Sequence, residues 1–164
     1  MNWTKLSAIS EILSSVAILV TLIYLAIQTQ QNADAIQAST RQAILEADQQ
    51  LLLSTMEDQE LQVIRYKPEL TDDEKIQLGV WLIAFIRMRE NNWSQYQNGV
   101  LDEATWYSYR SSIVAGLSSA KARTWWQKYA VNRGAFDSEF MSMVDELLAN
   151  TPVQKRSPLI EAFD

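Results

Sequence analysis

The segment from Ser7 to Asn32, SAISEILSSVAILVTLIYLAIQTQQN, restricts the possible folds more than any other part of the sequence. Within it, the sixteen residues from Ile12 to Ile27 carry no charge. A helix over this stretch would cover roughly 24 Å, and counting from Leu6 gives roughly 33 Å, against roughly 30 Å for the hydrocarbon core of a bilayer. We therefore expect residues 1–28 to form a transmembrane helix.

Two other structures fit a segment of this composition. A cleaved signal peptide needs a basic start and a small-residue cleavage site, for which Lys5 and residues 33–35 are the candidates. The core helix of a soluble protein can be equally apolar. The membrane helix is favoured because Trp3 and Tyr24 would lie near its two ends, and amphipathic rings prefer the membrane–water interfaces.

The basic residues around this segment predict its orientation. Lys5 precedes the apolar stretch, whereas the first basic residue after it is Arg41. Positively charged flanks are retained on the cytoplasmic side of a membrane. We therefore expect a single-pass protein with a cytoplasmic N-terminus and an exported body.

The small and polar side chains of the segment share one face of the expected helix. They recur at a and d positions of a heptad pattern, with Glu11 bordering them: Ser7, Ser10, Ser14, Ala17, Thr21, Tyr24 and Gln28. We call this set the seam. Helices associate in lipid through small residues and side-chain hydrogen bonds, so the seam is expected to face protein or water. Its partner would be a second copy of the chain or another membrane protein. The alternative is that the hydroxyls bond back to carbonyls of their own helix.

The heptad register continues beyond the apolar segment. No helix breaker occurs before Met56, and the same a and d positions are filled by Ala35, Ala38, Gln42, Leu45, Gln49, Leu52 and Met56. A second stripe contains Ile36, Ala43, Ile44, Ala47 and Leu51. The pattern predicts one helix over roughly 6–56, with residues 29–57 forming a stalk. The alternative is a break near residues 28–32.

Residues 58–150 are predicted to form a small helical bundle. A short helix should end before Pro68, and Thr71 to Glu74 reads as a capping box that starts the next helix. Further helices are expected to end at Asn98-Gly99, to begin at Asp102, to run from about residue 118 to Gly134, and to begin again at Asp137 or Ser138. Residues 151–164 are expected to be an extended tail. The fold class is therefore all-α, a long N-terminal helix followed by a Trp-rich bundle.

Aromatic residues concentrate between Trp81 and Tyr129. They predict either the core of the bundle or an aromatic ligand pocket, and the core is the favoured interpretation because aromatic side chains fill the most volume. Trp125 and Trp126 are adjacent and about 100° apart on a helix, so we expect only one of them to point fully into the core.

Composition excludes several classes of function. The chain has no His and no Cys, which excludes the usual zinc sites and Ser–His–Asp or Cys–His catalysis. The net charge is −6 without a basic run, so no nucleic-acid partner is expected. Arg87, Glu90 and Asn91 share one helical turn, an arrangement more typical of an ion pair than of an active site. We expect no enzyme activity, no cofactor and no metal.

Two segments, ENNWSQYQNGVLDEATW (Glu90–Trp106) and ARTWWQKYAVNRGAFDSEF (Ala122–Phe140), carry a family resemblance together with the ending LIYLAIQTQQNADAI of the first helix. The chain resembles an uncharacterised family of small bacterial proteins with one N-terminal hydrophobic helix and a helical body. This resemblance implies a bacterial protein with a single N-terminal membrane helix. Together with the orientation that Lys5 predicts, it leads us to expect a location in the bacterial inner membrane with the body on the periplasmic side.

Three functions follow from these patterns. The first is a membrane-anchored, self-associating protein with a structural or scaffolding role. The second is a homo-oligomeric ion channel lined by the N-terminal helix, with Glu11 as its ring of charge. The third is a ligand sensor or accessory subunit that uses the aromatic body.

Overall fold

The computed structural model describes residues 3–57 and 59–155, without the side chains of residues 4–6, 8, 57, 59 and 62. It divides into two compact units, Met1–Gln42 and Ala43–Asp164. The described residues form helices and contain no β-strand, apart from one isolated bridge between Ser119 and Gln154. The part of the predicted C-terminal tail from residue 156 to 164 lies outside the description. The predicted all-α class is confirmed.

The N-terminal helix α1 runs without interruption from Trp3 to Glu57. This confirms the long helix predicted over 6–56, and no break occurs at residues 28–32. The helix is long and apolar enough to cross a membrane, because it contains an 18-residue window with a mean hydropathy of 2.1. No part of that window is buried.

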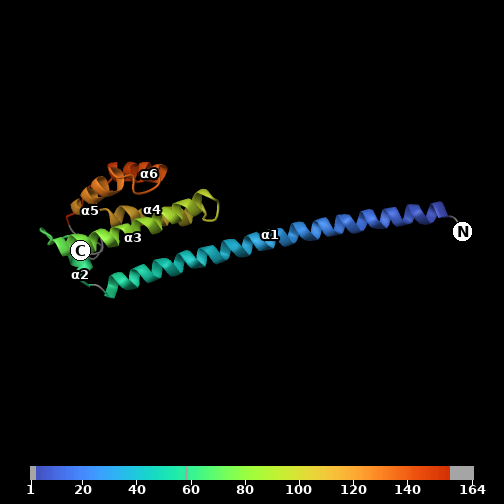
Figure 1. Ribbon diagram of the computed structural model, residues 1–164, viewed down its shortest axis with the longest axis horizontal. Coiled ribbons are helices and arrows are strands. Elements are labelled where there is room, and N and C mark those ends of the chain that lie inside the picture. The colour runs from blue at the N-terminus through green and yellow to red at the C-terminus, as the bar shows by residue number, and fades with distance from the viewer. Residues whose placement is uncertain (1–2, 58, 156–164) are drawn as a thin grey trace. The chain divides into compact units, whose positions relative to one another are not determined.

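The body contains shorter helices that follow α1 (Figure 1). Their bounds are α2 Gln59–Ile64, α3 Asp72–Gln97, α4 Glu103–Gly116, α5 Ala120–Trp125, the π-helix η1 Trp126–Val131, and α6 Ser138–Ala149. Helix α4 packs along α3, and α6 packs on α4. The body is thus the smaller helical unit that the sequence predicts after a long first helix.

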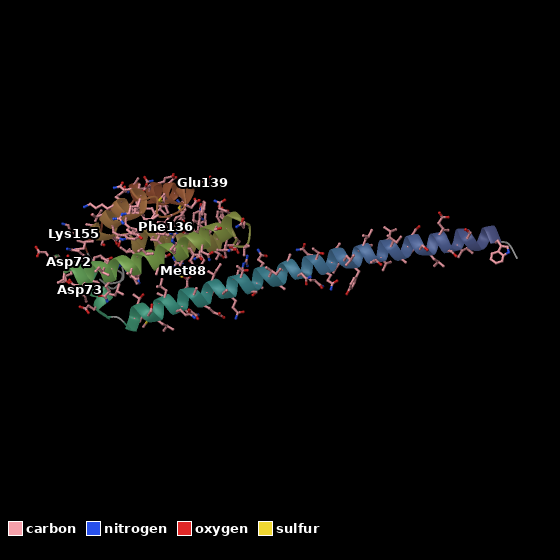
Figure 2. All side chains as sticks on the ribbon, in the orientation of Figure 1. Asp72, Asp73, Met88, Phe136, Glu139 and Lys155 are labelled. Carbon is pink, nitrogen blue, oxygen red and sulfur yellow. The ribbon has the colours of Figure 1, made fainter. Side chains whose placement is uncertain are left out.

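Local capping signals set most of the helix ends. At α3, the Thr71 hydroxyl accepts from the backbone N–H of Glu74 at 3.3 Å, and the Glu74 carboxylate accepts from the Thr71 N–H at 2.8 Å. Asp102 caps α4, and Asp137 rather than Ser138 caps α6. Asp72 and Asp73, labelled in Figure 2, are exposed at the start of α3, whereas the capping residue Glu74 is buried.

The helix predicted from about residue 118 to Gly134 is partly wrong. It begins after the Ser119 cap, but its second half is the π-helix η1, which residue spacing did not predict. The π-turns place Trp126 and Ala130 in the core. Lys128 stays exposed and Tyr129 stays partly exposed.

Aromatic and aliphatic side chains from every element of the body form one core. Trp126 is fully buried, and its indole N–H donates to Asp145 on α6 at 2.7 Å. Trp125 is only partly buried and stacks on Tyr129 with 5.2 Å between the ring centroids. Phe136, labelled in Figure 2, packs against Trp126 in this core. The expectation that only one residue of the Trp125–Trp126 pair fills the core is confirmed.

The last turns of α1 belong to the same body. Ile44 and Thr55 are buried, Leu51 packs against the core, and the indole N–H of Trp81 donates to the Thr55 hydroxyl at 3.0 Å. The a and d residues Leu45 and Leu52 remain exposed. One face of residues 43–57 therefore packs on the body while the heptad face stays uncovered.

Arg123 connects the ends of three segments of the body. Its guanidinium donates to the backbone carbonyls of Leu117, Leu148 and Thr151 at 2.9, 2.8 and 2.9 Å. These carbonyls lie at helix ends, where backbone acceptors lack intrahelical partners. A single side chain thereby joins the ends of α4 and α6 to α5.

Two helical glycines differ in the space around them. A Cβ at Gly116 would lie 2.4 Å from the ring of Phe85, which packs between Trp81 and Arg89 and cannot move freely. A Cβ at Gly79 would lie 3.7 Å from its nearest neighbour, Trp125 Nε1, which is an ordinary contact. The close approach of α4 to α3 therefore depends on glycine at position 116.

The two glycines should respond to alanine with opposite signs. Gly116→Ala should lower the free energy of unfolding by about 1–3 kcal/mol, because the core must shift around the added methyl group. Gly79→Ala should raise it by about 0.5–1 kcal/mol, because alanine favours helix and the site has room. Urea unfolding followed by tryptophan fluorescence measures both. Equal effects of the two substitutions would contradict this account of the α3–α4 contact.

Candidate functional site

The predicted seam on α1 is exposed at every described position from Ser7 to Gln28. The hydroxyl of Ser14 donates to the carbonyl of Ser10 at 2.8 Å, and that of Thr21 donates to the carbonyl of Ala17 at 2.8 Å. In the single chain, the hydroxyl hydrogens of Ser14 and Thr21 are therefore used for hydrogen bonds within α1, as the alternative interpretation expects. A hydroxyl oxygen that donates in this way still has lone pairs for a second helix. The role of the seam stays a prediction.

Arg89 on α3 and Asp48 on α1 form an ion pair that is largely enclosed by the body. Their side chains are 9% and 14% exposed, and Arg89 Nη1 lies 2.9 Å from Asp48 Oδ1. The rings of Phe85 and Tyr109 flank the guanidinium, each with its centroid 5.0 Å away. Sequence patterns did not reveal this pair, because the two residues lie far apart in the chain.

Neighbouring polar groups complete the environment of Arg89. With its amide oriented to match the neighbouring donors and acceptors, Asn92 accepts from Arg89 Nη1 through its oxygen at 3.0 Å and donates to the Met88 carbonyl through its nitrogen at 3.2 Å. Burial, followed by the charge of Asp48 and a hydrogen bond to it, raises the pKa of Tyr109. The phenol therefore stays protonated and neutral beside the ion pair. This cluster is a structural connection between α1, α3 and α4.

Arg87 and Glu90 also form an ion pair, at 2.7 Å. Arg87 donates to the Ala135 carbonyl at 2.6 Å, and the other carboxylate oxygen of Glu90 accepts from the Asp137 N–H at 2.5 Å. Asn91 is exposed on the adjacent position. The polar atoms of Arg87 and Glu90 thus hold the segment that leads into α6, which agrees with the structural interpretation of this turn.

A pocket of about 550 Å³ lies on the surface of the body, between α3, α5 and η1. Its floor is apolar and aromatic, and its rim is cationic. The floor contains Leu70, Leu78, Gly79, Leu82, Trp125 and Tyr129, and the rim contains Lys75, Lys121, Lys128 and Arg133. No carboxylate lines it among the described residues. Its volume is within the roughly 300–1,000 Å³ range of small-molecule sites.

The rim cations differ in how they are already engaged. Lys75 pairs with the exposed Asp72 at 2.7 Å, and Lys121 donates to the Lys67 carbonyl. Arg133 stacks on Tyr129 with its guanidinium 5.4 Å from the ring centroid. Neither Lys128 nor Arg133 has an ion-pair partner among residues 3–57 and 59–155.

An aromatic ligand pocket in the body was one alternative that the sequence offered, but the sequence did not predict its location or its basic rim. Its basic residues come from α3, α5, η1 and the turn after η1, so no single run marks them. The one local signal is the spacing of Lys121, Lys128 and Arg133 in an acidic chain. A second, smaller pocket of about 350 Å³ shares Lys121 with it. The described residues contain no cluster of three or more acidic side chains that could hold a metal ion.

Removing one partner of the Arg89–Asp48 pair should be costly. Asp48→Ala leaves a buried guanidinium without its counter-ion, which should lower the free energy of unfolding by about 3–5 kcal/mol. Combining it with Arg89→Met removes both charges and should recover most of the loss. Urea denaturation followed by tryptophan fluorescence measures both variants. A double variant less stable than Asp48→Ala would contradict the ion-pair assignment.

Comparisons with known protein families, with curated proteins and with solved structures found no match for this chain.

Proposed function

We propose that this protein is a membrane-anchored helical protein that self-associates through the seam of α1 and serves as a scaffold. The anchor would be the apolar first half of α1, whose length and hydropathy suffice to cross a bilayer. The body would lie on the periplasmic side of a bacterial inner membrane. The proposal includes no catalytic activity.

The exposed heptad face of residues 43–57 carries the self-association proposal. This part of α1 packs against the body, and Ile44 and Thr55 are buried there. Leu45, Leu52 and Met56 are instead 56%, 63% and 68% exposed, although they are apolar. They continue the a and d register of the seam. Packing them against a second copy of the same face would remove this apolar surface from water.

The two halves of the seam would contribute differently. Interhelical hydrogen bonds within a membrane contribute only about 0.6–2 kcal/mol each. Burial of a leucine side chain outside the membrane contributes about 1.5–3 kcal/mol. The aqueous half would therefore supply most of the affinity, and the Ser/Thr half would fix the register within lipid.

A channel is the second candidate, and Glu11 is the observation that favours it. An acidic residue beside a small, polar helical face inside lipid is a default candidate for function. An open axis would place a ring of these carboxylates in the path of ions and favour cations. Cation-selective conductance that Glu11→Gln reduces would support the channel over the scaffold.

The membrane anchor predicts how the protein fractionates. Full-length protein should remain in membranes after a carbonate wash, because its apolar helix lies in lipid. A variant lacking residues 1–42 keeps the compact unit that starts at Ala43, and it should be soluble and helical. Full-length protein recovered from the soluble fraction without detergent would contradict the anchor.

The aqueous half of the seam can be tested at adjacent leucines of similar exposure. Leu52 lies at a d position, whereas Leu53 lies at the neighbouring e position, where coiled coils tolerate charge. Leu52→Glu should weaken self-association at least about tenfold, since about 1.4 kcal/mol corresponds to tenfold. Leu53→Glu is the control. Sedimentation equilibrium in mild detergent measures both, and equal effects would mean that the register is wrong.

The membrane half has its own matched pair of substitutions. Replacing Ser14 and Thr21 together with Leu should disrupt or reset the oligomer, because bulky side chains keep the helices apart. Replacing Val16 and Val20 with Leu on the opposite face should leave it unchanged. Cross-linking in native membranes reads out both variants. Disruption by the valine variant alone would place the interface on the other face.

A further inference from the structure

The pocket between α3, α5 and η1 combines an apolar floor with a basic rim, two features that the packing of the body does not require. Its floor contains the partly exposed Leu70, Trp125 and Tyr129 together with the buried Leu78 and Leu82, and four cations line its rim. The whole chain has 14 Lys and Arg residues and a net charge of −6, so this cluster opposes the general charge of the protein. Like charges gathered in this way repel one another unless an anion lies between them.

Two cations of the rim are available to bind such an anion. Lys128 and Arg133 are exposed and have no carboxylate partner in the described part of the chain. Arg133 is already held by its stacking on Tyr129, so little side-chain entropy would be lost when it binds an anion. Lys75 lies on the α3 side of the same rim, with its ammonium 2.7 Å from the exposed Asp72.

The backbone around the pocket favours access to the floor. Gly79 lies in the interior of α3, where glycine costs about 1 kcal/mol relative to alanine. It lines the pocket, and the nearest atom to a Cβ at this position would be Trp125 Nε1 at 3.7 Å, so its missing side chain leaves the floor open. The opposite wall is the π-helix η1, a local distortion that is common at functional sites.

We propose that this pocket binds an amphipathic anion, with an acyl chain on the leucine and tryptophan floor and a carboxylate or phosphate head group between Lys128, Arg133 and Lys75. Two sources share this chemistry, a free fatty acid and an anionic phospholipid. The proposal does not depend on self-association through α1, because every residue involved lies in the body.

Binding is tested on full-length protein in nanodiscs of zwitterionic lipid, by isothermal titration calorimetry with empty nanodiscs subtracted. The probes are decanoate, its uncharged analogue decanol, and dihexanoyl phosphatidic acid as a soluble anionic phospholipid. Lys128→Gln with Arg133→Gln removes the unpaired rim charges. Arg110→Gln with Lys155→Gln removes two cations outside this pocket as the matched control.

The rim variant should weaken binding of the anionic probe at least about tenfold, while the control variant binds like the wild type. Decanol should bind more weakly than decanoate and be indifferent to the rim variant. Gly79→Leu fills the floor and should abolish binding, with circular dichroism confirming that it folds. If Gly79→Leu does not fold, the proposal is judged on the rim variant, Lys128→Gln with Arg133→Gln, whose substitutions are exposed.

The choice of probe distinguishes the two sources. Preference for decanoate indicates a free fatty acid, and preference for dihexanoyl phosphatidic acid indicates a membrane phospholipid; either supports the proposal. Absence of binding by both anions would overturn it, as would equal losses in the rim and control variants.

Discussion

The buried ion pair between Arg89 and Asp48 is the interaction on which the architecture of the body depends. A guanidinium as enclosed as that of Arg89 is stable only with a counter-ion, and Asp48 supplies it from the last part of α1. The ring of Phe85 lies against the same guanidinium and also fills the space that Gly116 leaves open. The pair therefore fixes residues 43–57 against α3, next to the contact between Phe85 of α3 and Gly116 of α4.

This arrangement gives the end of α1 two roles. Ile44, Asp48, Leu51 and Thr55 recur at helical spacing and face the body, so the long helix ends as part of a folded core. The heptad face beside them keeps its apolar side chains in solvent. A helix that is continuous from Trp3 to Glu57 carries one register from its apolar half to this exposed face. We infer that the body sets which face of the stalk stays available for a second copy.

The sequence predicts those parts of the fold that are encoded within a few neighbouring residues. The capping box at Thr71, the cap at Asp102 and the uninterrupted first helix follow from short spacings, and all three are present. The Arg89–Asp48 pair and the basic rim of the pocket join residues from separate helices, which no local spacing reveals. The π-helix buries Trp126, whose indole N–H donates to Asp145 of α6, and periodicity alone predicted an ordinary helix there.

Self-association along one register of α1 is the central claim, and cysteine scanning tests it most directly. The chain contains no cysteine, so single cysteines can be placed at consecutive positions along α1 and oxidised in native membranes. The account predicts that cross-linking follows the heptad, with maxima at Ser14, Ala17, Leu45 and Leu52. Uniform cross-linking around the helix, or maxima on the face of Val16 and Val20, would contradict it.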